Sequence, residues 1–377
     1  MVRMKRNAML RKMTGPGLFR LFLAFLVFAH HTTRLGFGTS AVFIFFSLSG
    51  FWIYKMYMGR YSATRVPYLT YLVSRAWRLL PVFVLISVLT LAYLYWSGSL
   101  ANYYRGNDAH FAFSSFFILG YYTLHPQPMV PAWSLDIEMQ FYLIAPLIAI
   151  LLARRIVAPV WAVVAAAFIS AASVLLGSKI PLPSYLLFFV IGMTAASVDW
   201  RPSRRLVMGS VAALATIIVL CVISPWREIL LIPPTPNPYS VYSLHANVVL
   251  AFLAIPYALY TTGQEGFCYD NTFGELSYIV YLLHWVGALY LASSPAIGLI
   301  QRYSLKAVVW CIVIGLSLVI WKFYDKPINR LRVRWVKSRS TLGVISQKSR
   351  QTVLVTKERF LDALYAQTRY PPALIIE

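Results

Sequence analysis

Long apolar runs follow one another along most of the chain, and charged residues interrupt them only rarely. An α-helix needs about 20 mostly apolar residues to cross a bilayer. Residues 113–123 are apolar but too few to cross, so they are expected to form an interfacial or re-entrant segment on the outer side. The pattern predicts an all-α integral membrane protein with about ten transmembrane helices, at residues 17–33, 39–58, 78–97, 131–153, 156–177, 182–198, 205–224, 243–262, 273–296 and 303–324.

Composition and charge fix the class and the orientation. The 377 residues are 59% hydrophobic and 12% charged, about half the charged fraction of a soluble domain. The net charge of +22 first suggests a nucleic-acid partner. With the N-terminus inside, however, 27 of the 34 Lys and Arg fall in inner segments and six in outer ones. The basic residues are thus explained by topology, with both termini cytoplasmic, and no nucleic-acid binding is expected.

The domain prediction follows from the same pattern. Residues 1–335 are expected to form one membrane-embedded domain, and residues 336–377 a basic cytoplasmic tail. The N-terminus begins like a signal peptide, but no small-residue cleavage site follows, so the first span is expected to stay attached. The three cysteines show no spacing typical of a disulfide pair or a metal site.

Ionisable residues stand inside the first predicted span, where hydrocarbon penalises them. A charged residue at a helix centre costs about 2.5–3.5 kcal/mol on insertion scales, so it is a functional candidate by default. Arg20 and His31 are eleven positions apart and therefore share one helix face. They are expected to line one cavity, although His31 in a purely interfacial position is the alternative. His30 points away, and the interfacial position is favoured for it.

Residues 131–146, PAWSLDIEMQFYLIAP, carry the second polar constellation. Ser134, Glu138 and Tyr142 recur every four residues on one face, and Asp136 and Gln140 form a second row. A carboxylate at the mouth of a span suits orienting or deprotonating an imidazole, so Glu138 is a catalytic candidate. The alternative is that both acidic residues only favour the positive helix N-terminus, and this is preferred for Asp136.

A third constellation lies in residues 275–285, ELSYIVYLLHW. Ser277, Tyr281 and His284 share one helix face, with Tyr278 beside them. Hydroxyls and an imidazole on one side indicate either a polar cavity or hydrogen bonds between helices.

Two arginines form the fourth candidate site, within residues 71–81, YLVSRAWRLLP. Arg75 and Arg78 lie three positions apart at the predicted cytoplasmic mouth of the third span. The planar guanidinium suits phosphate groups, so these residues are candidates for binding a phosphorylated ligand. Ordinary anchoring at the inner membrane surface is the alternative.

These four segments together resemble the acyltransferase family 3 of integral membrane proteins, over about residues 17–330. The order and spacing of the motifs carry the resemblance, since each motif alone is weak. Met139 stands where a second Glu is frequent, and Asp325 stands where Glu is commoner. The matching residues are Arg20, Ala24, Val27 and His31; Phe45, Phe46, Ser49, Gly50 and Phe51; Arg75, Arg78 and Pro81; Trp133, Ser134, Leu135, Glu138, Gln140, Phe141 and Tyr142; Ser277, Tyr278, Tyr281, Leu282 and His284; and Asp325, Lys326 and Pro327.

The resemblance implies an O-acyltransferase of a bacterial inner membrane. Such an enzyme moves an acyl group, usually acetyl, from cytoplasmic acyl-CoA to a hydroxyl of an exported or cell-surface glycan or glycolipid. The implied partners are the acyl-CoA donor, the glycan acceptor and membrane lipids. Acetyl-CoA is then a co-substrate, and neither a tightly bound cofactor nor a metal is expected. The oligomeric state is not predicted.

The resemblance also implies roles. His31 and Glu138 are the expected catalytic residues. Binding of donor or acceptor is expected from Arg20, Arg75, Arg78, Trp133, Ser134, Tyr142, Tyr278, Tyr281 and His284, with an interfacial anchor as the alternative for Trp133. His31 either deprotonates the acceptor hydroxyl or is acylated first, and both mechanisms stay open. The competing function is a transporter or flippase for a lipid-linked glycan that uses the same polar cavity.

Overall fold

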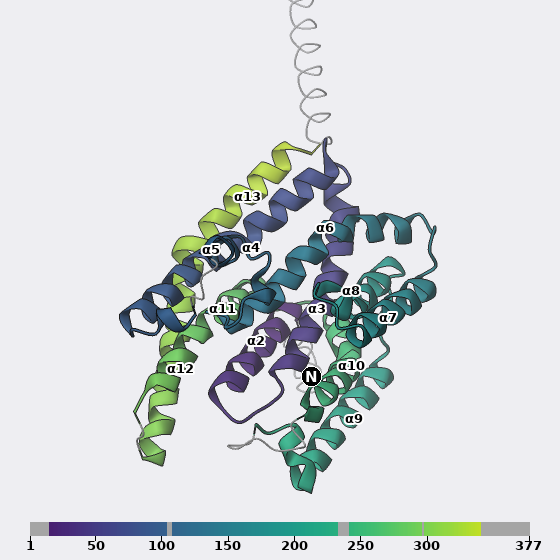
Figure 1. Ribbon diagram of the computed structural model, residues 1–377. Coiled ribbons are helices and arrows are strands. Elements are labelled where there is room, and N and C mark those ends of the chain that lie inside the picture. Colours follow the sequence, from purple (N-terminus) through teal and green to yellow (C-terminus); the bar gives the residue numbers. More distant parts are fainter. Residues whose placement is uncertain (1–14, 104–107, 233–240, 296–297, 341–377) are drawn as a thin grey trace, which may run out of the picture.

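The protein is a bundle of α-helices, seen in a computed structural model that describes residues 15–103, 108–232, 241–295 and 298–340 (Figure 1). Within these residues, seven helices are long and apolar enough to cross a membrane, and three shorter apolar helices accompany them. The prediction of an all-α polytopic membrane protein is thereby confirmed. The helices are α2 (Pro16–Thr32), α3 (Gly38–Met56), α4 (Pro67–Trp96), α5 (Asp108–Phe117), α6 (Trp133–Ala153), α7 (Pro159–Leu175), α8 (Leu182–Ser197), α9 (Arg204–Ile223), α10 (Ser243–Thr261), α11 (Asp270–Ser293), α12 (Leu299–Ile320) and α13 (Lys326–Ser338).

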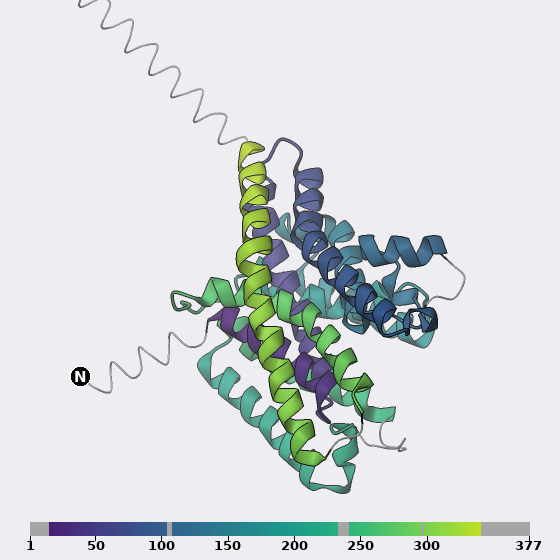
Figure 2. The same ribbon diagram turned by 90° about the vertical axis from the view of Figure 1, so that its left-hand side faces the viewer.

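Two helices are longer than the apolar runs predict. Helix α4 begins eleven residues before the predicted start, with Pro67 in the first helical turn, where a missing N–H costs nothing. Helix α12 continues through a π-helical turn, Trp321–Asp325, directly into α13. Figure 2 shows α12 and α13 as one straight rod. Of the predicted tail, residues 336–338 form the end of α13, and residues 341–377 lie outside the described part.

The short apolar segment 113–123 does not form a spanning helix. Its first half belongs to α5, which has 10 residues and lies across the direction of the α12–α13 rod in Figure 2. The chain then turns inward, so that Tyr121 is 1% exposed and its ring packs on Phe83. Asp136 holds this turn, because its carboxylate accepts hydrogen bonds from the Tyr122 backbone N–H and the Gln140 side chain, both at 2.9 Å.

Two close helix pairs form the centre of the bundle, α2 on α11 and α3 on α8. Glycines permit the second pair to approach: a Cβ at Gly50 would overlap the Phe189 carbonyl, and one at Gly192 would overlap the Ser47 carbonyl. Helices α9 and α12 bury far less of their surface, as expected for helices that face lipid.

A carboxylate from α11 caps the start of α2. Asp270 accepts hydrogen bonds from the backbone N–H groups of Gly17 and Leu18, each at 2.9 Å. The first N–H groups of a helix have no partner within that helix, so a carboxylate there satisfies them and matches the positive end of the helix dipole. The contact fixes the start of α2 on α11.

Candidate active site

A cavity of about 520 Å³ opens among helices α2, α3, α4, α6, α11 and α13. It is lined by the beginning of α2, α3 from Val42 to Met56, the Arg75–Leu79 stretch of α4, the Ser134–Tyr142 stretch of α6 and the first three turns of α11. The topology predicted from the sequence puts the portions of α2, α4 and α11 in the cytoplasmic half and the α6 portion in the outer half. The cavity has the size of a small-molecule site and mixes apolar walls with a few polar groups.

Arginines crowd the cavity. Arg20, Arg75, Arg78 and Arg332 all line it. Arg78 forms an ion pair with Asp325 at 2.9 Å, and its guanidinium lies 5.5 Å from the centroid of the Tyr278 ring. Arg20 has no hydrogen bond or ion pair within the described residues, and its charged neighbours are Arg78, Glu138 and Arg75. The predicted phosphate-binding arginines therefore do converge on one space, and Arg20 presents a free guanidinium to it.

Glu138 also faces the cavity, and two hydroxyl groups hold it. Its Oε1 accepts hydrogen bonds from Ser49 Oγ at 2.6 Å and from Tyr142 OH at 2.8 Å. Both donors bind one oxygen, so the other can meet a ligand. The four-residue spacing of Ser134, Glu138 and Tyr142 correctly predicts that all three line one space.

Two hydroxyl side chains of the cavity lining meet between α6 and α11. Ser134 Oγ and Tyr281 OH are 2.7 Å apart, and each lies 3.0 Å from the carbonyl oxygen of Pro131; the two hydroxyl protons are shared among these three contacts. Tyr278, one turn earlier on α11, donates to the Leu79 carbonyl at 2.9 Å. These hydrogen bonds join α6 and α4 to α11 beside the cavity.

His31 and His284 lie outside the lining of the cavity. His31 is not among the cavity-lining residues; its ring stacks on His284 with centroids 5.4 Å apart, and lies edge-on to Trp285 at 5.2 Å. His284 is fully buried, its Nδ1 lies 3.2 Å from the Val280 carbonyl, and its Nε2 has no hydrogen-bond partner in the described part of the chain. The His284 ring is 6.2 Å from the Tyr281 ring. Ring contacts thus connect Tyr281, which lines the cavity, to His284, and His284 to His31.

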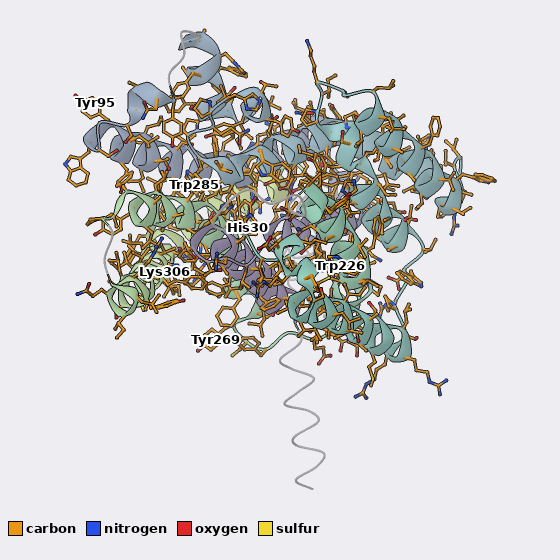
Figure 3. All side chains as sticks on the ribbon, turned by 60° about the horizontal axis from the view of Figure 1, so that its bottom comes forward. His30, Tyr95, Trp226, Tyr269, Trp285 and Lys306 are labelled. Atoms are coloured by element: carbon orange, nitrogen blue, oxygen red, sulfur yellow. The ribbon has the colours of Figure 1, made fainter. Side chains whose placement is uncertain are left out.

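His30 and His31 differ in their surroundings. His30 Nδ1 lies 3.1 Å from the Leu35 carbonyl, and its ring is edge-on to His31. In Figure 3 His30 and Trp285 lie toward the middle of the molecule, whereas Tyr95 lies at its periphery. Arg20 and His31 share a helix face as predicted, but that face meets the cavity at one end and His284 at the other.

Trp133 lies outside the cavity lining. Its ring packs in an aromatic cluster with Phe46, Tyr122 and Tyr185. Apart from Trp133, His31 and His284, all the site residues predicted from the sequence line this one cavity.

Ser49, Asn329 and Arg332 line the cavity but are not predicted as site residues from the sequence. Ser49 is part of a family motif, but its hydrogen bond to Glu138 depends on which helices are neighbours. The sequence does contain a pattern that could have indicated Asn329 and Arg332, because they follow Asp325 at helical spacing and share one helix face with it.

The described residues contain no group of three or more His, Cys, Asp or Glu that could hold a metal ion.

Comparison with known proteins gives one result. A family described as an acyltransferase domain has a sequence model that matches residues 14–323, which covers every site residue above except Asp325, Asn329 and Arg332. No curated protein and no solved structure matches the chain.

Proposed function

From the premise that this chain belongs to the acyltransferase 3 family, and is thus a membrane acyltransferase, we propose its substrates. The donor is cytoplasmic acyl-CoA, with acetyl as the group moved. The acceptor is a hydroxyl of an exported or cell-surface glycan or glycolipid, and the membrane is a bacterial inner membrane. The enzyme is an O-acetyltransferase.

One observation carries the choice of donor. Four arginines line a cavity that also reaches Ser134 and Tyr281. Guanidinium groups bind phosphates in forked geometry, and the apolar side chains of the same cavity suit a thin acyl-carrying arm. Acyl-CoA combines both features, with phosphates at one end and a thioester at the other.

In this proposal, different residues of the cavity contact different parts of the donor. Arg75 and Arg78 hold the phosphorylated end of the donor, and Arg20 lies beside the arm that reaches past Glu138. Arg20 can stabilise the negative charge that develops on the thioester oxygen. The thioester meets His31 when Tyr281 moves aside, since Tyr281 and His284 stand between cavity and His31.

Two transfer routes use His31. In the first, His31 takes the proton of the acceptor hydroxyl, the oxygen bonds to the acyl carbon, the C–S bond breaks, and CoA leaves with that proton. In the second, an imidazole nitrogen forms the bond to the acyl carbon, the C–S bond breaks, and CoA leaves as a thiol with the ring N–H proton; the acceptor oxygen then displaces the imidazole, which takes the hydroxyl proton. Both routes end in an ester and free CoA.

The test uses purified protein in vesicles, with radiolabelled acetyl-CoA and an extract of membrane glycans. The wild type is expected to transfer label to the glycan fraction. His31→Ala should lose at least about 100-fold in rate, the usual contribution of a general base. His30→Ala is the matched control and should retain most activity.

The competing function is tested by the same assay. A transporter for lipid-linked glycan would move glycan without consuming acetyl-CoA. Vesicles that move glycan but release no CoA would overturn the proposal, and so would full transfer by a correctly inserted His31→Ala variant.

Glu138→Gln gives a second test of the site. The amide keeps the shape but removes the charge beside Arg20, so transfer is expected to fall at least about tenfold. Tyr142→Phe removes one of the two donors to Glu138 and leaves the cavity volume nearly unchanged. It should reduce the rate less than Glu138→Gln does, and the reverse order would contradict this role of the carboxylate.

A further inference from the structure

A fully buried histidine of α11 has a hydrogen-bond acceptor that nothing uses. His284 is 0% exposed, and its Nδ1 lies 3.2 Å from the Val280 carbonyl oxygen, one helical turn earlier. A carbonyl oxygen only accepts, so Nδ1 carries the ring proton and Nε2 is left as an acceptor. Nε2 has no hydrogen-bond partner among the described residues. A buried polar atom without a partner costs free energy, so it calls for an explanation.

The position of Nε2 in the ring narrows the choice of donor. Nε2 is one of the two ring atoms farthest from Cβ, so it points away from the backbone of α11. The helix that packs most closely on α11 is α2. Two rings of α2 contact His284, those of Phe28 and His31, each with centroids 5.4 Å away. Of these two rings, only that of His31 has an N–H group to donate.

The two imidazoles are arranged for an edge-to-edge contact. The planes of His31 and His284 differ by 21°, and their centroids are 5.4 Å apart. Two imidazoles that share an N–H···N hydrogen bond have centroids about 5 Å apart, since each nitrogen lies about 1.1 Å from its ring centre. A small rotation of the His31 side chain therefore forms the bond. His31 has no hydrogen bond to the described residues, so the rotation breaks none.

The carboxylate that the sequence favours for orienting His31 is held elsewhere. Glu138 Oε1 accepts hydrogen bonds from Ser49 and Tyr142, at 2.6 and 2.8 Å. Glu138 also lines the cavity, whereas His31 does not. In this arrangement of helices the group that orients His31 has to come from another residue.

Three rings surround His31, and one of them offers a suitable acceptor. Trp285 has only a donor, and the Pro128 carbonyl takes it at 2.8 Å. The His30 ring is 80° from the plane of His31 and so is not placed edge to edge with it. The third ring is that of His284, which is nearly parallel to His31 and has the unused Nε2.

We infer that His284 is a positioning residue for His31: its Nε2 accepts the N–H of the His31 ring and fixes which His31 nitrogen is bare. This inference rests on the proposed function, in which His31 is the base or the nucleophile. Both transfer routes need a lone pair, which imidazole has only on the nitrogen without a proton. The bond keeps the proton on the side of His284 and the lone pair on the other nitrogen. It strengthens when His31 becomes positive, because a charged donor binds more strongly.

Three replacements of His284 test this role by label transfer in vesicles. Glutamine places an acceptor oxygen near the position of Nε2, asparagine reaches only as far as Nδ1, and phenylalanine keeps a ring without an acceptor. We expect kcat within about threefold of wild type for His284→Gln, and at least about tenfold lower for His284→Asn and His284→Phe, the contribution of one hydrogen bond. KM for acetyl-CoA should stay unchanged, since His284 does not line the cavity.

A purely structural role of His284 gives the opposite order. If the side chain only fills space, His284→Phe retains transfer, whereas His284→Gln and His284→Asn both lose it because they open the same gap. That order, or equal losses in all three variants, overturns the inference. The comparison of His284→Gln with His284→Phe is decisive by itself if His284→Asn does not insert.

The tautomer of His31 is a second readout, and it needs no substrate. The full chain is labelled with ¹⁵N-histidine and placed in nanodiscs, and the His31 signals are identified from their loss in His31→Ala. The wild type is expected to show one neutral tautomer of His31, because one nitrogen holds the proton against His284. His284→Phe should show a mixture of both tautomers. A mixture in the wild type, or a single tautomer in His284→Phe, contradicts the inference.

Two controls accompany the tautomer measurement. His30, whose Nδ1 lies 3.1 Å from the Leu35 carbonyl oxygen, should keep its tautomer in every variant. Trp310→Phe disturbs the packing beside the pair, since Trp310 stacks on Phe28 with centroids 4.1 Å apart. It should leave the His31 tautomer unchanged, and a mixture in this variant would assign the tautomer to packing and overturn the inference.

The outcomes separate this inference from the proposed function. A wild type with a single His31 tautomer that transfers no label overturns the proposed function and supports the hydrogen bond. A wild type that transfers label while His31 populates both tautomers overturns the role of His284 alone.

Discussion

Replacing Asp270 with alanine should weaken the attachment of α2 to α11. Its carboxylate is the acceptor for two backbone N–H groups at the start of α2, those of Gly17 and Leu18. A hydrogen bond to a charged group contributes about 1.5–3 kcal/mol net. Both bonds lie at a cavity, where a substituting water can recover part of the loss, so the low value applies to each. The free energy of unfolding is expected to fall by about 3 kcal/mol.

Replacing Asp270 with asparagine should give a smaller loss of stability than replacing it with alanine. Asp270→Asn keeps one carbonyl oxygen and loses the charge, so it should lose about half as much, ~1.5 kcal/mol. The assay is reversible unfolding in mixed micelles by titration with a denaturing detergent. Because α2 carries Arg20 and His31, label transfer should fall in the same order.

A nearby acidic residue supplies the control. Glu265 is exposed in the segment before α11, and its replacement by alanine should leave unfolding and transfer unchanged. An Asp270→Ala variant within about 1 kcal/mol of the wild type would refute the reasoning, because two charge-assisted bonds cannot vanish at that cost.

Three further outcomes can be measured. Asp136→Ala should lower the free energy of unfolding by about 2–3 kcal/mol, since it leaves the Tyr122 N–H donor without its acceptor; thermal unfolding in detergent checks this. Gly50→Ala should lower the free energy of unfolding by about 1–3 kcal/mol, because the added methyl group forces α3 away from α8. A disulfide between cysteines introduced on the facing sides of α3 and α8 should then form more slowly. The hydrogen bond and charge of Lys55 hold the pKa of the exposed Asp199 carboxyl below its usual range. The pair therefore stabilises the fold above the ordinary carboxyl pKa, and the contribution is lost as pH falls through the lowered one; Lys55→Met should raise the Asp199 pKa in an NMR titration.

The positions of the spans follow from the sequence because hydrocarbon imposes a length. Apolar runs of about 20 residues leave little choice of where a helix crosses. The N-terminal part of α4 escapes this rule. Residues such as Thr70 and Arg75 are not apolar, and their helical state depends on packing against α13 and the turn Tyr57–Tyr61 rather than on lipid.

The site is predictable within helices and much less so between them. The period of 3.6 residues places Ser134, Glu138 and Tyr142 in one row, and the structure agrees. The same period says nothing of which helix lies opposite. The bonds from Ser49 to Glu138 and from Tyr281 to Ser134 need the tertiary arrangement, as does the turn of His31 toward His284 rather than into the cavity.

The separation of the cavity from His31 has a consequence for the permeability of the membrane. A membrane potential is worth about 2.3 kcal/mol per charge for every 100 mV. A continuous polar channel from Arg20 to His31 would let water and ions through and dissipate that potential. Arg20, Ser134 and Tyr281 line the cavity of the described residues, whereas His31 and His284 do not. The protein can thus hold its arginines and histidines inside the bilayer without one open channel that joins them.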